Sequence, residues 1–236
     1  MIKIISAPSK ENPFVVLYKP SDLPSAPLNE NDTDNAFYEC AKLFPELLSV
    51  HGKKQCEHGL LHRLDTATNG LLVIAASDEA YTALQLSQQN GLFEKTYTAV
   101  CDHDTPLLEA FPPFPTEWKK KLRKGEECCI ESYFRAFGEG GREVRPVTQD
   151  SGKAALKKCG KTLYKTHICI KDTIAICRII AGYRHQVRSH LSWAGYAVKG
   201  DFLYNPTASA SDTLQFTATS VRFPHPLTSE VIEFSL

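Results

Sequence analysis

The sequence predicts an α+β fold whose main sheet is largely antiparallel and is flanked by helices. Short apolar or alternating runs bounded by turn residues occur along the whole chain, whereas apolar residues show helical spacing in only a few segments. One pair of alternating runs is joined by a two-residue turn, which is typical of an antiparallel hairpin. No internal repeat, low-complexity segment or clear linker divides the 236 residues, so we expect a single domain over residues 1–236.

The first half of the chain predicts two strands and two helices. The apolar run 14–18 ends at a Lys-Pro pair, which predicts a buried strand leading into an extended loop. Helical spacing predicts a helix over 34–48. The apolar run 71–76 follows an Asn-Gly pair and predicts a second buried strand. Ser77 is then placed to cap a helix that closes at the Asn-Gly pair 90–91.

The second half is richer in strands. The run 93–101 alternates and predicts a strand, whereas 102–126 contains several prolines and ends in a basic run, which predicts a surface excursion. Two β-branched runs, 164–170 and 173–180, are joined by Lys171-Asp172 and predict a hairpin. The remaining elements are a helix and two closing strands, expected at 184–194, 216–223 and 231–234.

The composition is typical of a globular protein, since 42% of the residues are hydrophobic and 23% are charged. The longest apolar run, 71–76, has six residues, whereas a membrane-spanning helix needs ~20, and no signal-peptide core is present near the N-terminus. We therefore expect a cytoplasmic protein that does not contact a membrane. The eight cysteines form no CxxC pair, so we expect reduced, mostly buried thiols and no metal site.

The formal net charge is zero, but the charges are unevenly distributed. The segment 142–188 contains 11 basic and 3 acidic residues, a surplus of eight positive charges that the rest of the chain balances. A clustered basic surface is the electrostatic pattern of a phosphate-binding face. The alternative is an ordinary solvated face, so the pattern alone does not establish nucleic-acid binding.

One tetrapeptide combines candidate catalytic side chains. His62-Arg63-Leu64-Asp65 lies in a polar loop just before the apolar run 71–76, so a carboxylate would be held at the end of a rigid strand. Protein-kinase catalytic loops also begin with His-Arg, but this chain has no glycine-rich loop and no Asp-Phe-Gly motif, which excludes a kinase. Taken alone, the tetrapeptide favours a structural interpretation, in which Asp65 caps a turn and pairs with Arg63.

Further blocks occur together with this tetrapeptide in a specific order. They are Lys19–Pro27, His62–Asp65 with Thr68-Asn69-Gly70, Lys95-Thr96-Tyr97, Gly182–Leu191, Gly200–Tyr204 and Phe223–Pro226. The ordered set resembles the RluA-type family of RNA pseudouridine synthases. The resemblance implies the pseudouridine-synthase fold with a central RNA-binding cleft, and isomerisation of uridine to pseudouridine in structured rRNA or tRNA. It also implies a monomer that uses no metal, ATP or other cofactor.

The resemblance implies three catalytic residues. Asp65 matches the family's catalytic aspartate, which either forms a covalent adduct with the sugar or removes the 2′ proton, and the sequence does not choose between these routes. Arg188 matches the arginine that pairs with this carboxylate and keeps it ionised. Tyr97 matches the tyrosine that lies against the uracil and is a candidate base for the C5 proton.

The resemblance also implies residues that contact RNA. Arg63 matches the arginine that fills the position of the flipped nucleotide. The other candidates are His62, Lys95, Arg184, His185 and Gln186. Three positions depart from the family pattern and affect RNA positioning more than chemistry: Tyr183 where arginine is usual, Thr217 where histidine is common and Asn205 where glycine is usual.

Two alternatives come from other classes of protein. The first is an RNA-binding or RNA-folding protein that keeps the scaffold without needing catalysis, and the departures from the family pattern motivate it. The second is a nucleoside hydrolase that uses one aspartate, although the chain lacks a dense aspartate cluster. We also expect no N-terminal S4-type RNA-binding domain, because few residues precede the first predicted strand.

Overall fold

A computed structural model describes residues 1–29 and 31–236. Backbone contacts divide the chain into two compact units: unit 1 comprises Met1–Lys95 and Thr217–Leu236, and unit 2 comprises Thr96–Phe216. Both units combine helices with mainly antiparallel strands, which confirms the α+β class. Among the described helices, none is both long and apolar enough to cross a membrane. The single catalytic domain stays a prediction.

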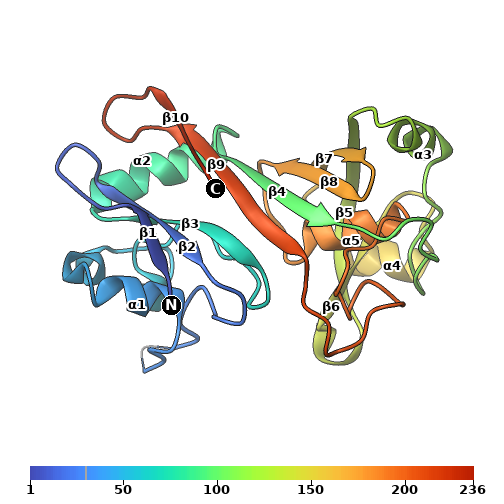
Figure 1. Cartoon of the computed structure of the whole chain (residues 1–236), viewed down its shortest axis with the longest axis horizontal. Helices are drawn as coiled ribbons and strands as arrows, with labels where there is room; N and C mark the ends of the chain where they lie inside the picture. Colours follow the sequence, from blue (N-terminus) through green and yellow to red (C-terminus); the bar gives the residue numbers. More distant parts are fainter. Residues whose placement is uncertain (30) are drawn as a thin grey trace. The chain divides into compact units, whose positions relative to one another are not determined.

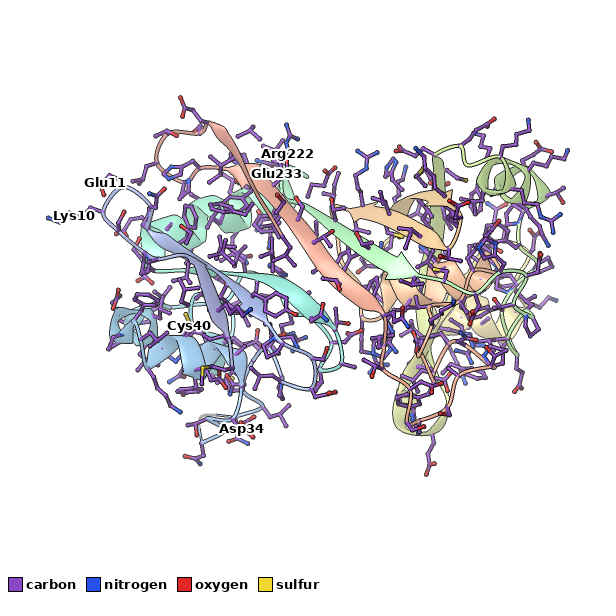
Figure 2. All side chains as sticks on the ribbon, viewed as in Figure 1. Lys10, Glu11, Asp34, Cys40, Arg222 and Glu233 are labelled. Atoms are coloured by element: carbon purple, nitrogen blue, oxygen red, sulfur yellow. The ribbon has the colours of Figure 1, made fainter. Side chains whose placement is uncertain are left out.

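The sheet of unit 1 confirms the strands predicted near both ends of the chain. Its strands are β1 (Lys3–Ser6), β2 (Phe14–Lys19), β3 (Asn69–Ala75), β9 (Phe216–Pro224) and β10 (Val231–Ser235). All neighbouring pairs are antiparallel except β3 and β9, which run parallel where Asn69 and Gly70 meet Thr217 and Ala218. Figure 2 shows Arg222 and Glu233, which are partners in the register of β9 with β10.

The helices of unit 1 differ from the prediction in one place. α2 (Asp78–Gln89) begins and ends where expected, because the Ser77 hydroxyl accepts the amide N–H of Ala80 and Asn90 follows as the C-cap. The helix predicted over 34–48 was wrong in length: α1 (Ala36–Ala41) is short, and two 3-10 turns follow, η1 (Pro45–Ser49) and η2 (Gln55–Glu57). Pro45 disfavours helical dihedrals at the preceding residue, so the segment restarts in another geometry.

The core of unit 1 forms on the strands because both faces of β2 and β3 are buried. One cluster joins these strands to α2 and to β9 and β10, with Phe93 stacked on Phe223 at 5.1 Å between ring centroids. In Figure 1, α1 and α2 lie on opposite sides of β2 and β3. Continuous apolar runs such as 71–76 therefore arise from strands covered on both faces.

Unit 2 contains the hairpin expected over 164–180 and the helix expected over 184–194. Its strands are β4 (Glu94–Val100), β5 (Cys128–Phe137), β6 (Glu143–Val147), β7 (Tyr164–Lys171) and β8 (Ile174–Ile179), in the order β4-β8-β7-β5-β6. Its helices are α3 (Thr116–Arg123), α4 (Lys153–Lys158) and α5 (Gln186–Trp193), with a 3-10 turn, η3 (Glu139–Gly141). α5 packs against β6 and β7. It begins two residues later than predicted, because His185 adopts a left-handed conformation.

The segment 102–126 is only partly the surface excursion that the prolines predicted. It contains α3, whose Leu122 is buried, and Phe111 is buried as well. The indole of Trp118 contacts that of Trp193 at 5.8 Å between ring centroids. These apolar contacts attach the segment to α5, which the basic and proline-rich composition concealed.

α5 is anchored by a histidine in the core of unit 2. The ring nitrogens of His190 lie 2.9 Å from the Ser132 hydroxyl on β5 and 2.8 Å from the Thr166 hydroxyl on β7. Burial lowers the pKa of His190 to about 3, so the ring is neutral near pH 7. The orientation of α5, and of the side chains it presents, is thereby tied to two strands.

Candidate active site

The backbone on both sides of Asp65 is held by the segment that follows β2. Ser25 is buried, and its hydroxyl accepts the N–H of Leu64 at 2.9 Å and donates to the carbonyl of Leu64 at 2.8 Å. The Lys19 ammonium donates to the carbonyl of Thr66 at 3.0 Å. Asp65 therefore lies between two anchored neighbours, and the half-buried carboxylate projects from a constrained loop.

Lys19 is a fully buried cation with a complete set of hydrogen-bond acceptors. Besides Thr66, it donates to the carbonyls of Pro20 at 2.8 Å and Leu23 at 2.7 Å. Burial lowers its pKa to about 8, while the nearby carboxylates of Asp22 and Asp65 act in the opposite direction. The same lysine thus fixes the loop and places positive charge near Asp65.

Directly after the Asp65 loop, the backbone of β3 passes close to that of β9. Gly70 pairs with Ala218 in the parallel contact of β3 with β9, and its φ of +127° is one that L-residues with side chains rarely adopt. A Cβ atom at this position would lie 2.2 Å from the carbonyl oxygen of Ala218. Glycine is therefore required here, and the end of the loop is joined firmly to the sheet of unit 1.

The other candidate residues of unit 1 differ strongly in exposure. Arg63 is exposed, and its guanidinium lies 3.4 Å from the Glu57 carboxylate, a loose pair that leaves it accessible. His62 packs its ring edge against Phe93 at 5.7 Å between centroids. Lys95, at the start of β4, is only 7% exposed.

In unit 2, Arg188 has a carboxylate partner that the sequence interpretation missed. Its Nε and Nη2 atoms each donate to a different oxygen of Asp201 at 2.7 Å, and both side chains are almost completely buried. Bidentate geometry fixes the plane of the guanidinium as well as its position. Asp201 lies in the Gly200–Tyr204 block, so the signal for it was present in the sequence although its role was not.

A tyrosine connects this ion pair to the rest of unit 2. The Arg188 guanidinium carbon lies 5.3 Å from the centroid of the Tyr204 ring. The Tyr204 hydroxyl accepts the N–H of Val144 at 2.8 Å and lies 3.0 Å from Nδ1 of His185. Burial raises the pKa of Tyr204, so the phenol is neutral and acts as a structural contact.

Tyr97 is supported on one face. It lies on β4, is mostly buried, and stacks on Phe216 with ring centroids 5.1 Å apart and planes inclined by 8°. Lys95 and Tyr97 are two residues apart on this strand, so their side chains leave the same face of β4. Stacking restricts the rotation of the Tyr97 ring and orients its hydroxyl.

The residues around the start of α5 make contacts within unit 2. The Gln186 amide donates to the Lys165 carbonyl at 2.9 Å and to the Thr166 hydroxyl at 3.0 Å. Its oxygen accepts the N–H of Tyr183 at 2.9 Å. Arg184 is exposed and donates to the carbonyls of Gly141 and Glu143. These contacts give Gln186 an internal role that the sequence did not indicate.

Some basic side chains of the segment 142–188 are buried rather than exposed. Arg145 and Arg188 are buried, and Arg145 pairs with Glu143 at 2.7 Å. Five of the exposed members lie on and after α4: Lys153, Lys157, Lys158, Lys161 and Lys165; the other exposed ones are Arg142, Lys171 and Arg184. The exposed positive charge of this segment is therefore densest on and after α4.

The predicted site residues divide between the two units. Asp65, Arg63, His62 and Lys95 belong to unit 1, and Tyr97, Arg188, Arg184, His185 and Gln186 belong to unit 2. In unit 1, Lys95 lies near His62. In unit 2, His185 and Arg188 both contact Tyr204. The pairing of Asp65 with Arg188 and the approach of Tyr97 to Asp65 stay predictions. Sequence interpretation missed the positioning roles of Lys19, Ser25 and Asp201, although each lies in a block that it singled out.

Comparisons with known proteins identify the family. The family model for RNA pseudouridylate synthase matches residues 13–193, which is most of the chain. The chain therefore belongs to the RNA pseudouridylate synthase family. Its fold is similar to that of human RNA pseudouridylate synthase domain containing 1, with a TM-score of 0.66, 17% identity, and coverage of 100% of this chain and 83% of that one.

Two relatives in sequence are each 28% identical to this chain. The dual-specificity RNA pseudouridine synthase RluA of Pasteurella multocida is 28% identical over 228 residues, which cover 94% of this chain and 88% of the relative. The uncharacterized RNA pseudouridine synthase YlyB of Bacillus subtilis is 28% identical over 186 residues, which cover 75% of this chain and 50% of the relative. The chain thus spans about half the length of some relatives that it matches.

Proposed function

We propose that this protein is an RNA pseudouridine synthase that isomerises uridine to pseudouridine in rRNA or tRNA. The observation that carries the proposal is the family match, which spans the Asp65 loop together with the elements that bear Tyr97 and Arg188. The anchoring of Leu64 and Thr66 on either side of Asp65 supports it, because a group that reacts at a sugar carbon needs a fixed position.

The reaction is an isomerisation whose atoms balance without a co-reactant. The C1′–N1 bond of the nucleotide breaks, the detached uracil rotates, and C1′ bonds to C5 instead. The proton leaves C5, and N1 gains a proton. We assign Asp65 the role of nucleophile at C1′ or of base towards the 2′ proton. Both roles need the ionised carboxylate, and the Lys19 ammonium lies near it.

Arg188 and Tyr97 have separate tasks in this proposal. Arg188 pairs with the reacting carboxylate, and the bidentate contact with Asp201 orients its guanidinium for that purpose. Tyr97 lies against the uracil and receives the C5 proton, with its ring held by Phe216. The protein acts as a monomer in the cytoplasm, and the balanced isomerisation requires no metal or cofactor.

Access to the base requires that the nucleotide leave its stack, which costs a few kcal/mol. We assign exposed Arg63 to the vacated position, where a planar guanidinium can stack on neighbouring bases. Arg184 and the exposed lysines after α4 supply phosphate contacts. His185 contacts RNA at the start of α5, whereas the buried Gln186 supports the loop that carries Arg184.

The experiment is pseudouridine mapping in total RNA from a strain that lacks the protein. Incubation with the purified full chain should create pseudouridine at one or more uridines, and Asp65→Asn should create none. Asp34→Asn, which removes an exposed carboxylate of the same unit, is the matched control and should retain the activity. The proposal is wrong if the unmodified protein produces pseudouridine at no uridine of rRNA or tRNA.

A further inference from the structure

Unit 1 contains two buried lysines whose surroundings differ in one respect. Burial lowers the pKa of both Lys19 and Lys95 to about 8. The three N–H groups of Lys19 donate to three backbone carbonyls. Lys95 is 7% exposed, yet within residues 1–29 and 31–236 its ammonium has neither a hydrogen bond nor an ion pair.

The side chain next to Lys95 is unpaired as well. Neither ring nitrogen of His62 has a hydrogen-bond partner among the described residues, although both atoms are buried. The imidazole makes an edge contact with Phe93. Burial and the nearby Lys95 charge hold the pKa of His62 well below its ordinary value, so the ring is neutral and carries one N–H donor.

Two neighbouring donors without acceptors are costly in a folded protein. A desolvated cation that lacks a partner destabilises the native state, and buried polar groups are nearly always paired. Replacing such a lysine by an apolar residue of similar size would favour folding. A buried, unpaired cation with a perturbed pKa is therefore a candidate functional group. The chemistry that satisfies an ammonium and an imidazole N–H together is an anion with several acceptor oxygens.

The position of the pair narrows the class of anion. His62 lies three residues before Asp65, and Lys95 leaves the same face of β4 as Tyr97. A polymeric substrate that presents a nucleotide to Asp65 and Tyr97 carries phosphates on both sides of that nucleotide. We propose that Lys95 and His62 together bind one backbone phosphate of the RNA, next to the reacting nucleotide. The inference rests on the proposed function and adds to it a defined phosphate site.

The test compares Lys95→Met with Lys42→Met, which removes an exposed lysine of the same unit. Fluorescence anisotropy with a labelled ten-nucleotide oligouridylate, repeated at several salt concentrations, measures the number of phosphate contacts. Loss of one contact should reduce the slope of log affinity against log salt by ~0.7, which corresponds to about fourfold weaker binding at ~0.15 M salt. His62→Leu should also weaken binding, while it retains the apolar contact with Phe93.

A stability measurement separates this role from a structural one. Lys95→Met should leave the melting temperature unchanged or raise it, whereas Lys19→Met should lower it because three carbonyls lose their donor. Inorganic phosphate should raise the melting temperature of the unmodified protein more than that of Lys95→Met. Lys42→Met should match the unmodified protein in every measurement.

The inference is overturned if Lys95→Met lowers the melting temperature while the salt slope stays that of the unmodified protein. Pseudouridine formation is measured separately on the same proteins. If the unmodified protein forms no pseudouridine but Lys95→Met still reduces the salt slope, the proposed activity fails and the phosphate site stands. If pseudouridine forms and the slope is unchanged, only the phosphate site fails.

Discussion

Ser25→Ala tests whether the segment after β2 positions the catalytic loop. The Ser25 hydroxyl makes two hydrogen bonds to the backbone of Leu64, at 2.8 and 2.9 Å, and both residues are buried. A net contribution of ~0.5–1.5 kcal/mol for each bond, with a penalty of ~1–3 kcal/mol for the unsatisfied buried N–H, gives a loss of roughly 2–6 kcal/mol. This is a large part of a typical domain stability of ~5–15 kcal/mol.

The assay pairs urea unfolding with single-turnover pseudouridine formation. Ser77→Ala is the matched control in the same unit, because it removes the N-cap of α2 and should cost ~1 kcal/mol without affecting the reaction. Ser25→Ala should cost more and should also slow the single-turnover rate, since Asp65 follows Leu64 directly. Binding of RNA should change little.

The reasoning is refuted if Ser25→Ala loses no more stability than Ser77→Ala and keeps the full single-turnover rate. A loss of stability with an unchanged rate would show that Ser25 supports the fold alone. In that case the orientation of Asp65 would depend on Lys19 and Thr66.

Three further predictions concern the backbone, the buried ion pair and a titrating histidine. Gly70→Ala should lower the free energy of unfolding by ~3 kcal/mol or more, through strain and overpacking of ~1–3 kcal/mol each. Gly152→Ala should cost ~1 kcal/mol or less, because no atom lies within 4 Å of an added Cβ and only the N-cap of α4 is weakened. Equal effects of the two changes in urea unfolding would contradict this. Asp201→Asn removes one charged acceptor of Arg188 and should reduce kcat about ten- to hundredfold, equivalent to ~1.5–3 kcal/mol, with little change in KM. An unchanged kcat would show that other contacts orient Arg188. Burial lowers the pKa of His190 to about 3, against an ordinary value of 6.5. Between these two pH values the unfolded chain binds a proton at this ring and the folded chain does not. The free energy of unfolding should therefore fall as the pH drops below about 6.5. His190→Gln should reduce this slope by up to ~1.4 kcal/mol per pH unit, and an unchanged slope would argue against a neutral buried ring.

Elements whose signals lie within a few residues were predicted well. The Ser77 cap, the end of α2 and the turn between β7 and β8 depend on neighbours in the chain, and all are present where expected. The helix expected over 34–48 was wrong because apolar spacing outweighed the effect of Pro45. The helix α3 went unpredicted because its burial depends on Trp193, which lies far along the chain.

The candidate site shows the same contrast between features set by neighbouring residues and features set by distant contacts. The types of the reacting residues could be assigned from ordered blocks, since Asp65, Tyr97 and Arg188 each occur in a short recognisable motif. The residues that hold the reacting side chains in place could not be assigned from the sequence, because their contacts join distant positions. Ser25 bonds to Leu64, 39 residues further along the chain, and Lys19 bonds to Thr66, 47 residues further along. The bidentate hold on Arg188 likewise depends on the turn that places Asp201 against α5.

The sequence by itself determined which side chains are available for the reaction and which local segments are strands, helices and caps. Local dihedral preferences and apolar periodicity act between residues that are close in the chain, so they can be read directly. Only the tertiary structure decided that Lys19 is satisfied by three carbonyls while Lys95 has no partner among the described residues. Burial and pairing depend on every segment that packs around a group, and they determine which of two similar lysines supports the fold and which is left to bind a ligand.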